Sequence, residues 1–181
     1  MKTATRNLED DHIHILKLTD VMKIVIRSDK PDITHIEDII DIIRNFADGL
    51  HHAKEENLLF PALETKGFSA RQGPVAVMLN EHTEGRNFVK EIAANLDLFK
   101  KGNKAALAGM YQNMSGYAEL LNNHITKENN ILFRMADNSL SETEQKNLLD
   151  RFESLEQNRP AGSGVDNYVD RINALALFYK V

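Results

Sequence analysis

The chain has 181 residues, of which 42% are hydrophobic and 27% are charged, so it is long enough for one globular domain with a sizeable core. Its net charge of −5, without any stripe of lysine or arginine, argues against a nucleic-acid-binding protein. The absence of cysteine excludes thiolate metal sites, disulfides and cysteine nucleophiles.

Membrane and export signals are also missing from this sequence. No run of about 18 apolar residues is present, so we expect no membrane span. The N-terminal stretch MKTATRNLEDDH lacks the apolar segment of a signal peptide. We therefore expect a cytoplasmic protein.

Helical periodicity covers nearly the whole chain, and alternating strand patterns are missing. Pro61 falls near the end of the second predicted helix and is expected to kink its last turn. The Ser141/Glu144 pair is a capping box that predicts the start of the fifth helix. In chain order, the predicted helices cover about 7–27, 31–65, 74–100, 104–136, roughly fifteen residues after Ser141, and 165–179.

Four long helices with short connections predict an all-α fold, an antiparallel (up-down) four-helix bundle. We expect residues 1–138 to form this bundle. Residues 139–181 are expected to pack on its outside as a C-terminal helical extension of the same domain.

A short pattern occurs twice, as HHAKEENLLF (His51–Phe60) and as HITKENNILF (His124–Phe133). Each copy places a histidine four residues before a glutamate, which puts the two side chains on one helix face. Asp11-His12 precedes the first copy and Glu81-His82 precedes the second, so the pattern indicates an internal two-fold repeat.

The helical phase of these residues predicts that they face one apolar core. Six candidates lie on the buried seams of their helices with the three-then-four spacing of core positions, namely His12, His51, Glu55, His82, His124 and Glu128. A buried carboxylate without a partner is costly, so bound cations are expected to neutralise the two glutamates. Imidazole with carboxylate suits iron, and also zinc or manganese.

The number of donors indicates an open two-metal site. Two bridging glutamates, four histidines and one oxo or hydroxo bridge make each metal five-coordinate. One position per metal then remains for a small ligand, as expected for a reactive site rather than a closed structural one.

Several alternatives remain at individual positions. His14 replaces His12 if the first helix is rotated, and His52 with Glu56 forms a competing pair that we place on the outer face. Glu81 either orients a ligand histidine or is solvated. For Arg86, Tyr111 and Tyr117, core packing or surface charge is favoured over a role behind the ligands.

The chain resembles the bacterial hemerythrin-like HHE cation-binding proteins in its Asp10–His12, His51–Leu63, Asn80–His82 and His124–Phe133 segments. The resemblance implies a four-helix bundle with a non-haem di-iron centre. The implied ligands are His12, His51, Glu55, His82, His124 and Glu128.

The resemblance is incomplete at Arg86. Oxygen-carrying hemerythrins have a second ligand histidine at this position of the third helix, so reversible oxygen carriage is disfavoured. The four-histidine, two-glutamate set is more similar to the iron-binding domain of the iron–sulfur cluster repair proteins. Those are linked to nitrosative stress and have a cysteine-containing N-terminal segment, whereas this chain has no cysteine.

The functional expectation is a di-iron protein that binds or reacts with a small oxidant: oxygen, peroxide or nitric oxide. The alternative is a metal storage or donor module, such as an iron supply for iron–sulfur cluster repair, without oxygen chemistry. A purely structural bundle is a third hypothesis. A conventional enzyme is not indicated: a zinc hydrolase lacks an obvious general base outside the ligands, and ferritin-type oxidases use Glu-x-x-His instead.

Overall fold

The computed structural model describes residues 3–160 and 162–181, and every regular element within these ranges is helical. The predicted all-α class is therefore confirmed for this part of the chain. The α-helices are α1 (Ala4–Val25), α2 (Ile33–Ile42), α3 (Phe60–Glu64), α4 (Pro74–Lys100), α5 (Ala106–Lys127), α6 (Phe133–Ser139), α7 (Glu142–Gln157) and α8 (Val165–Tyr179). Three π-helical segments continue or join them: η1 (Ile43–His52), η2 (Glu55–Leu59) and η3 (Glu128–Leu132).

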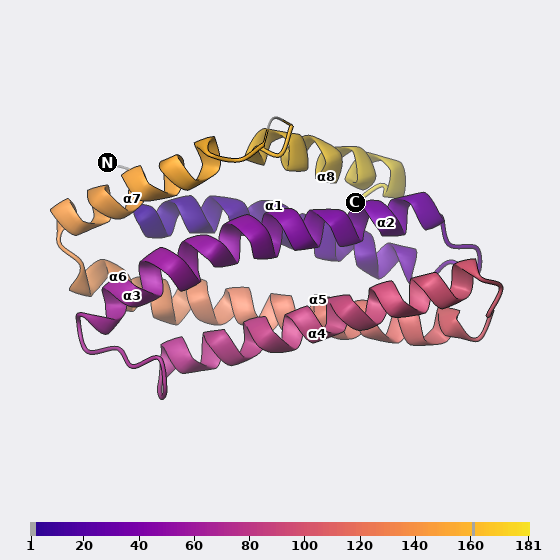
Figure 1. Cartoon of the computed structure of the whole chain (residues 1–181), viewed down its shortest axis with the longest axis horizontal. Helices are drawn as coiled ribbons and strands as arrows, with labels where there is room; N and C mark the ends of the chain where they lie inside the picture. The colour runs from indigo at the N-terminus through magenta and orange to yellow at the C-terminus, as the bar shows by residue number, and fades with distance from the viewer. Residues whose placement is uncertain (1–2, 161) are drawn as a thin grey trace.

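The long helices lie side by side, and the chain reverses direction at each connection between them (Figure 1). Helix α1, the α2–η1–η2–α3 rod, α4, and the α5–η3–α6 rod make up this assembly. Helices α7 and α8 lie along one side of it, where both pack against α1. Within the described part of the chain, no helix is both long and apolar enough to cross a membrane.

Side-chain caps explain where three helices begin. Thr3 accepts a hydrogen bond from the backbone N–H of Arg6, so α1 starts at Ala4, three residues earlier than predicted. Asp32 caps α2 in the same way. The capping box predicted at Ser141 and Glu144 is present at the start of α7 and confirms the fifth helix.

The π-helical segments change which residues face the core. The regular α-helical phase predicts Ile131 as a core residue after Glu128, but Ile131 is 50% exposed and Leu132 is 1% exposed. A π-helical turn contains one additional residue, so the buried face moves on by one position after it. The same shift buries Leu59 and Leu63 after η2.

A polar layer separates two apolar clusters within the bundle. One cluster includes Ile15, Leu50, Val89 and Leu121, and the other includes residues at the opposite end of the same rods. The second cluster contains Leu8, Leu58, Met78 and Leu132. On every rod, the predicted histidine and glutamate positions fall between a residue of one cluster and a residue of the other. Both clusters exclude water from the layer between them.

Candidate metal centre

Four histidines from four different segments meet in this layer as two pairs. The Nε2 atoms of His12 and His51 lie 3.0 Å apart, and those of His82 and His124 lie 3.2 Å apart. All four side chains are buried, with at most 2% exposure. The first pair joins α1 to η1, and the second joins α4 to α5.

Two fully buried glutamates connect the histidine pairs. The Glu55 Oε2 atom lies 3.7 Å from His51 Nε2 and 3.4 Å from His82 Nε2. The Glu128 Oε2 atom lies 3.2 Å from His124 Nε2 and 3.2 Å from His12 Nε2. Through Oε2, each carboxylate therefore contacts one imidazole of each pair.

The oxygens of both glutamates are left without hydrogen-bond donors. In the described part of the chain, none of the four carboxylate oxygens of Glu55 and Glu128 has a hydrogen-bond partner. Leaving such buried groups unsatisfied costs about 1–3 kcal/mol each. Two orphaned carboxylates surrounded by inward-facing imidazoles form a donor set that fits bound cations.

The two carboxylates have opposite pKa shifts. Burial, together with the adjacent Glu128, raises the pKa of Glu55 well above its ordinary value. Burial also acts to raise the pKa of Glu128, but the imidazoles of His124 and His12 outweigh it and lower that pKa. Of the two carboxyls, Glu55 therefore binds a proton more readily than Glu128 does.

Every one of these histidines has its outer ring nitrogen held by a polar side chain. The distances from Nδ1 are 2.8 Å for His12 to Asn129, 3.3 Å for His51 to Asp11, 2.7 Å for His82 to Glu56, and 3.0 Å for His124 to Glu81. These contacts orient each ring so that Nε2 faces the centre. From the sequence, Glu81 is expected either to orient a ligand histidine or to be solvated, and its contact with His124 supports the first interpretation.

Two lysines form ion pairs with the acidic side chains that contact His51 and His124. Lys54 is fully buried, and its Nζ lies 2.9 Å from Asp11 and 2.5 Å from Glu156 of α7. Lys127 forms an ion pair with Glu81 at the equivalent place in the other half. Sequence reasoning missed these lysines, although both occupy the same position in the repeated pattern.

Burial and neighbouring charges give two of the histidines different protonation behaviour. Burial, with a contribution from His12, lowers the pKa of His51 to about 4. Burial also acts to lower the pKa of His124, but Glu128 and Glu81 outweigh it and raise that pKa to about 9. His51 is therefore a neutral imidazole at neutral pH, whereas His124 would have to lose a proton before it could bind a metal ion.

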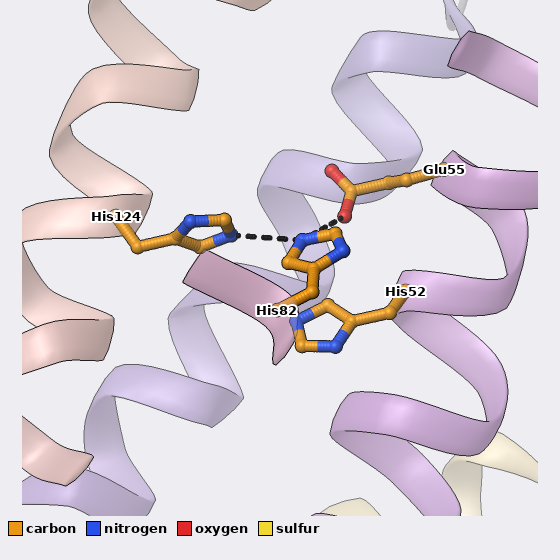
Figure 2. A group of neighbouring side chains, drawn as sticks. All are labelled: His52, Glu55, His82 and His124. Atoms are coloured by element: carbon orange, nitrogen blue, oxygen red, sulfur yellow. Dashed lines mark hydrogen bonds and ion pairs between the residues drawn. The ribbon is translucent and has the colours of Figure 1, made fainter. Parts of the chain in front are cut away.

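The structure corrects the predicted position of His52. This side chain is only 5% exposed, and its ring stacks on that of His82 with centroids 3.8 Å apart and planes 15° apart (Figure 2). The outer-face prediction assumed α-helical spacing, but residue 52 lies in the π-helical η1, where the angle between successive residues is smaller. Glu56, assigned to the same face, is half-buried and contacts His82.

The structure also places His14, Tyr117 and Arg86, for which the sequence left alternatives open. His14 is half-buried and belongs to neither group of potential metal-binding side chains, whereas His12 lies in the layer. Tyr117 packs in the core, as favoured by the sequence. Arg86 is paired with Asp48 and Glu56, at 2.7 Å from each, beside a cavity of about 240 Å³ that His52 and Tyr117 also line.

All six predicted candidates are brought together, and His52 joins them. Potential ligand atoms lie within 4.8 Å of one another in two overlapping groups that share Glu55. The first group is His12, His51, Glu55 and Glu128, and the second is His52, Glu55, His82 and His124. Two adjacent metal sites with a shared carboxylate fit this arrangement.

Comparison with known proteins agrees with the geometry. The family model described as the hemerythrin HHE cation-binding domain matches residues 3–136. An uncharacterized protein of Mycobacterium tuberculosis, Rv1995, is 23% identical over 174 residues, which cover 94% of this chain and 68% of the relative. The iron–sulfur cluster repair protein YtfE of Escherichia coli O157:H7 is 33% identical over 88 residues, covering 48% of this chain and 40% of YtfE. No solved structure gave a significant match.

Proposed function

Because the chain belongs to the hemerythrin HHE cation-binding domain family, we propose that it is a non-haem di-iron protein that binds or reacts with oxygen, peroxide or nitric oxide. One observation carries the proposal: Glu55 and Glu128 are fully buried, their oxygens have no hydrogen-bond partner among the described residues, and each contacts an imidazole of both histidine pairs. Such carboxylates are suited to bridging two cations.

The proposed ligands follow from the distances at the site. His12 and His51 would hold one iron and His82 and His124 the other, and Glu55 and Glu128 would be shared between the two ions. In this proposal the long helices form an up-down four-helix bundle with an internal repeat, and residues 139–181 are an extension of the same domain. Bound iron supplies one-electron redox chemistry and open coordination positions for a small ligand.

The chain's own residues prepare the site for this chemistry. Asp11, Glu81, Glu56 and Asn129 hold the outer nitrogens of the imidazoles, so the ring orientations exist before metal enters. The apolar clusters on both sides exclude water and keep the local dielectric constant low. The expected partner is a small diatomic molecule or peroxide rather than a macromolecule.

A second function is favoured by the similarity to YtfE, which is named as an iron–sulfur cluster repair protein. By this similarity the chain stores or donates iron without oxygen chemistry. The matched region covers 48% of this chain and 40% of YtfE, so the similarity extends over less than half of either protein. Release of iron to an apo-protein acceptor in the absence of oxidant is the expected behaviour for this alternative.

The optical spectrum of the iron-loaded protein tests the proposal. Protein loaded anaerobically with two equivalents of ferrous iron is recorded before oxygen, after oxygen and after oxygen removal. A near-ultraviolet charge-transfer absorption that develops with oxygen supports oxidant chemistry, and its persistence after oxygen removal indicates stable oxidation. Nitric oxide is tested in the same way.

A matched variant makes the spectrum specific to the site. Glu128→Gln removes one bridging carboxylate at unchanged size and is expected to abolish the absorption, while the exposed Glu84→Gln retains it. Stoichiometric iron binding with no response to either oxidant would favour the storage function. Failure to bind iron would refute the di-iron assignment.

A further inference from the structure

The two halves of the site match closely at the predicted ligands but differ at the position of His52. In the aligned copies, Lys54 corresponds to Lys127, and both support an acidic partner of a histidine. By the same alignment, His52 corresponds to Ile125, and both side chains are buried. One half of the site therefore contains an additional imidazole where the other contains an aliphatic side chain.

His52 is held in the same way as the four predicted ligands. Its Nδ1 lies 3.2 Å from Asp48 Oδ1, and Arg86 Nε lies 2.9 Å from the same oxygen. This carboxylate is replaced by Leu121 in the aligned copy, so the polar pair exists in one half alone. The Nε2 atom of His52 has no hydrogen-bond partner within residues 3–160 and 162–181.

The distances at His52 are compatible with coordination. One of its ring nitrogens lies within 4.8 Å of ligand atoms of Glu55, His82 and His124. With bonds of about 2.1 Å, donors around one ion lie roughly 3.0 to 4.2 Å apart, so these separations need to shrink by at most about 1.8 Å. The ring is stacked nearly parallel on His82 (Figure 2). A cavity of about 240 Å³, which His52 lines, lies beside it, so the ring is not tightly enclosed on that side.

We propose that His52 is a fifth imidazole ligand, bound to the metal ion that His82 and His124 hold, so that the two metal ions of the centre are inequivalent. This inference rests on the proposed di-iron centre. The ion at His82 and His124 has three imidazoles, whereas the ion at His12 and His51 has two. Asp48 is the positioning residue that directs His52 toward the ion.

Mössbauer spectroscopy distinguishes two inequivalent ions from two equivalent ones. The full chain is loaded anaerobically with two equivalents of ⁵⁷Fe(II). We expect two quadrupole doublets of equal area from the wild-type protein. This measurement uses no variant, so it does not depend on how a substitution affects folding.

His52→Ile places in the first half the residue that the second half has at the aligned position. The variant is expected to bring the two doublets together and to weaken binding of one of the two ions by at least about tenfold. The half-buried His14, which is outside both groups, gives the control His14→Ala, expected to retain two doublets and both affinities. Far-ultraviolet circular dichroism of each metal-free variant checks its folding.

The outcomes separate the two proposals. Two bound irons with a single wild-type doublet, together with unchanged affinities in His52→Ile, would overturn the assignment of His52 and leave the di-iron centre intact. A wild-type protein that does not bind two irons would overturn both proposals. Two doublets that persist unchanged in His52→Ile would also refute the role of His52, because another difference would then cause the inequivalence.

Discussion

Replacing Glu55 with glutamine tests whether the buried carboxylates exist for metal binding at the expense of stability. Glu55 is fully buried, its two oxygens have no hydrogen-bond partner among the described residues, and burial with the neighbouring Glu128 raises its pKa. Glutamine has the same shape, introduces no charge, and has an amide that can donate a hydrogen bond to Glu128.

The expected gain follows from the unsatisfied group. Glutamine has no charge to desolvate and takes up no proton on folding, and its amide can donate to Glu128, so it relieves the penalty of the buried carboxyl, which is about 1–3 kcal/mol. For a domain of this size, each 1 kcal/mol shifts Tm by roughly 2–4 °C. We therefore expect metal-free Glu55→Gln to unfold about 2–12 °C above the metal-free wild-type protein.

With metal bound, the wild-type protein should instead be the more stable of the two. Free iron at about 1,000 times Kd stabilises the native wild-type protein by about 4 kcal/mol per site, and the variant should lose most of this gain. Thermal unfolding followed by circular dichroism, in chelator and in anaerobic ferrous iron, measures both effects, and the exposed Glu84→Gln is the matched control. A metal-free Glu55→Gln that is less stable than the wild-type protein, or one that keeps the full metal-induced shift, would refute the reasoning.

Three further predictions concern protonation and the buried lysine. Because the pKa of His51 is lowered from 6.5 to about 4 in the folded protein, His51 of the unfolded chain is protonated first as the pH falls. The metal-free stability should therefore fall by about 3 kcal/mol between pH 6.5 and 4, which urea midpoints across this range can measure. Because the pKa of His124 is raised to about 9, its contribution to metal-free stability is complete below pH 6.5 and is lost as the pH rises through 9. Iron binding should therefore release a proton at pH 7 and become stronger toward pH 9, which calorimetry in buffers of different ionisation enthalpy can measure. Lys54→Met leaves the Asp11 carboxylate buried without its cation and should lower the free energy of unfolding in urea by about 3–5 kcal/mol. Lys127 is more exposed, so Lys127→Met should lower it by less than about 1 kcal/mol, and equal losses would contradict the buried role of Lys54.

Much of the candidate site was predictable because helical phase is a local property. His51 and Glu55 are one turn apart on a rod whose apolar residues have the same period, so their common direction follows from the sequence. The repeated pattern predicts an equivalent pair at His124 and Glu128. The structure places both pairs in one buried layer.

The pairing of the halves needed the tertiary structure. The contact of Glu55 with His82, and the contact of Glu128 with His12, join segments that no local pattern relates. The same is true of Lys54, whose contact with Glu156 ties α7 to the support of His51. These contacts depend on how helices pack, and packing is decided by side chains far apart in the chain.

By itself, the sequence determined the all-helical class, the six inward-facing donors and their duplication, because a regular helix turns by a constant angle per residue. Only the tertiary structure decided where that regularity is broken. The π-helical segments expose Ile131, bury Leu132 and direct His52 toward His82, because a π-helical turn is wider than an α-helical one. No local pattern in the sequence indicated these wider turns.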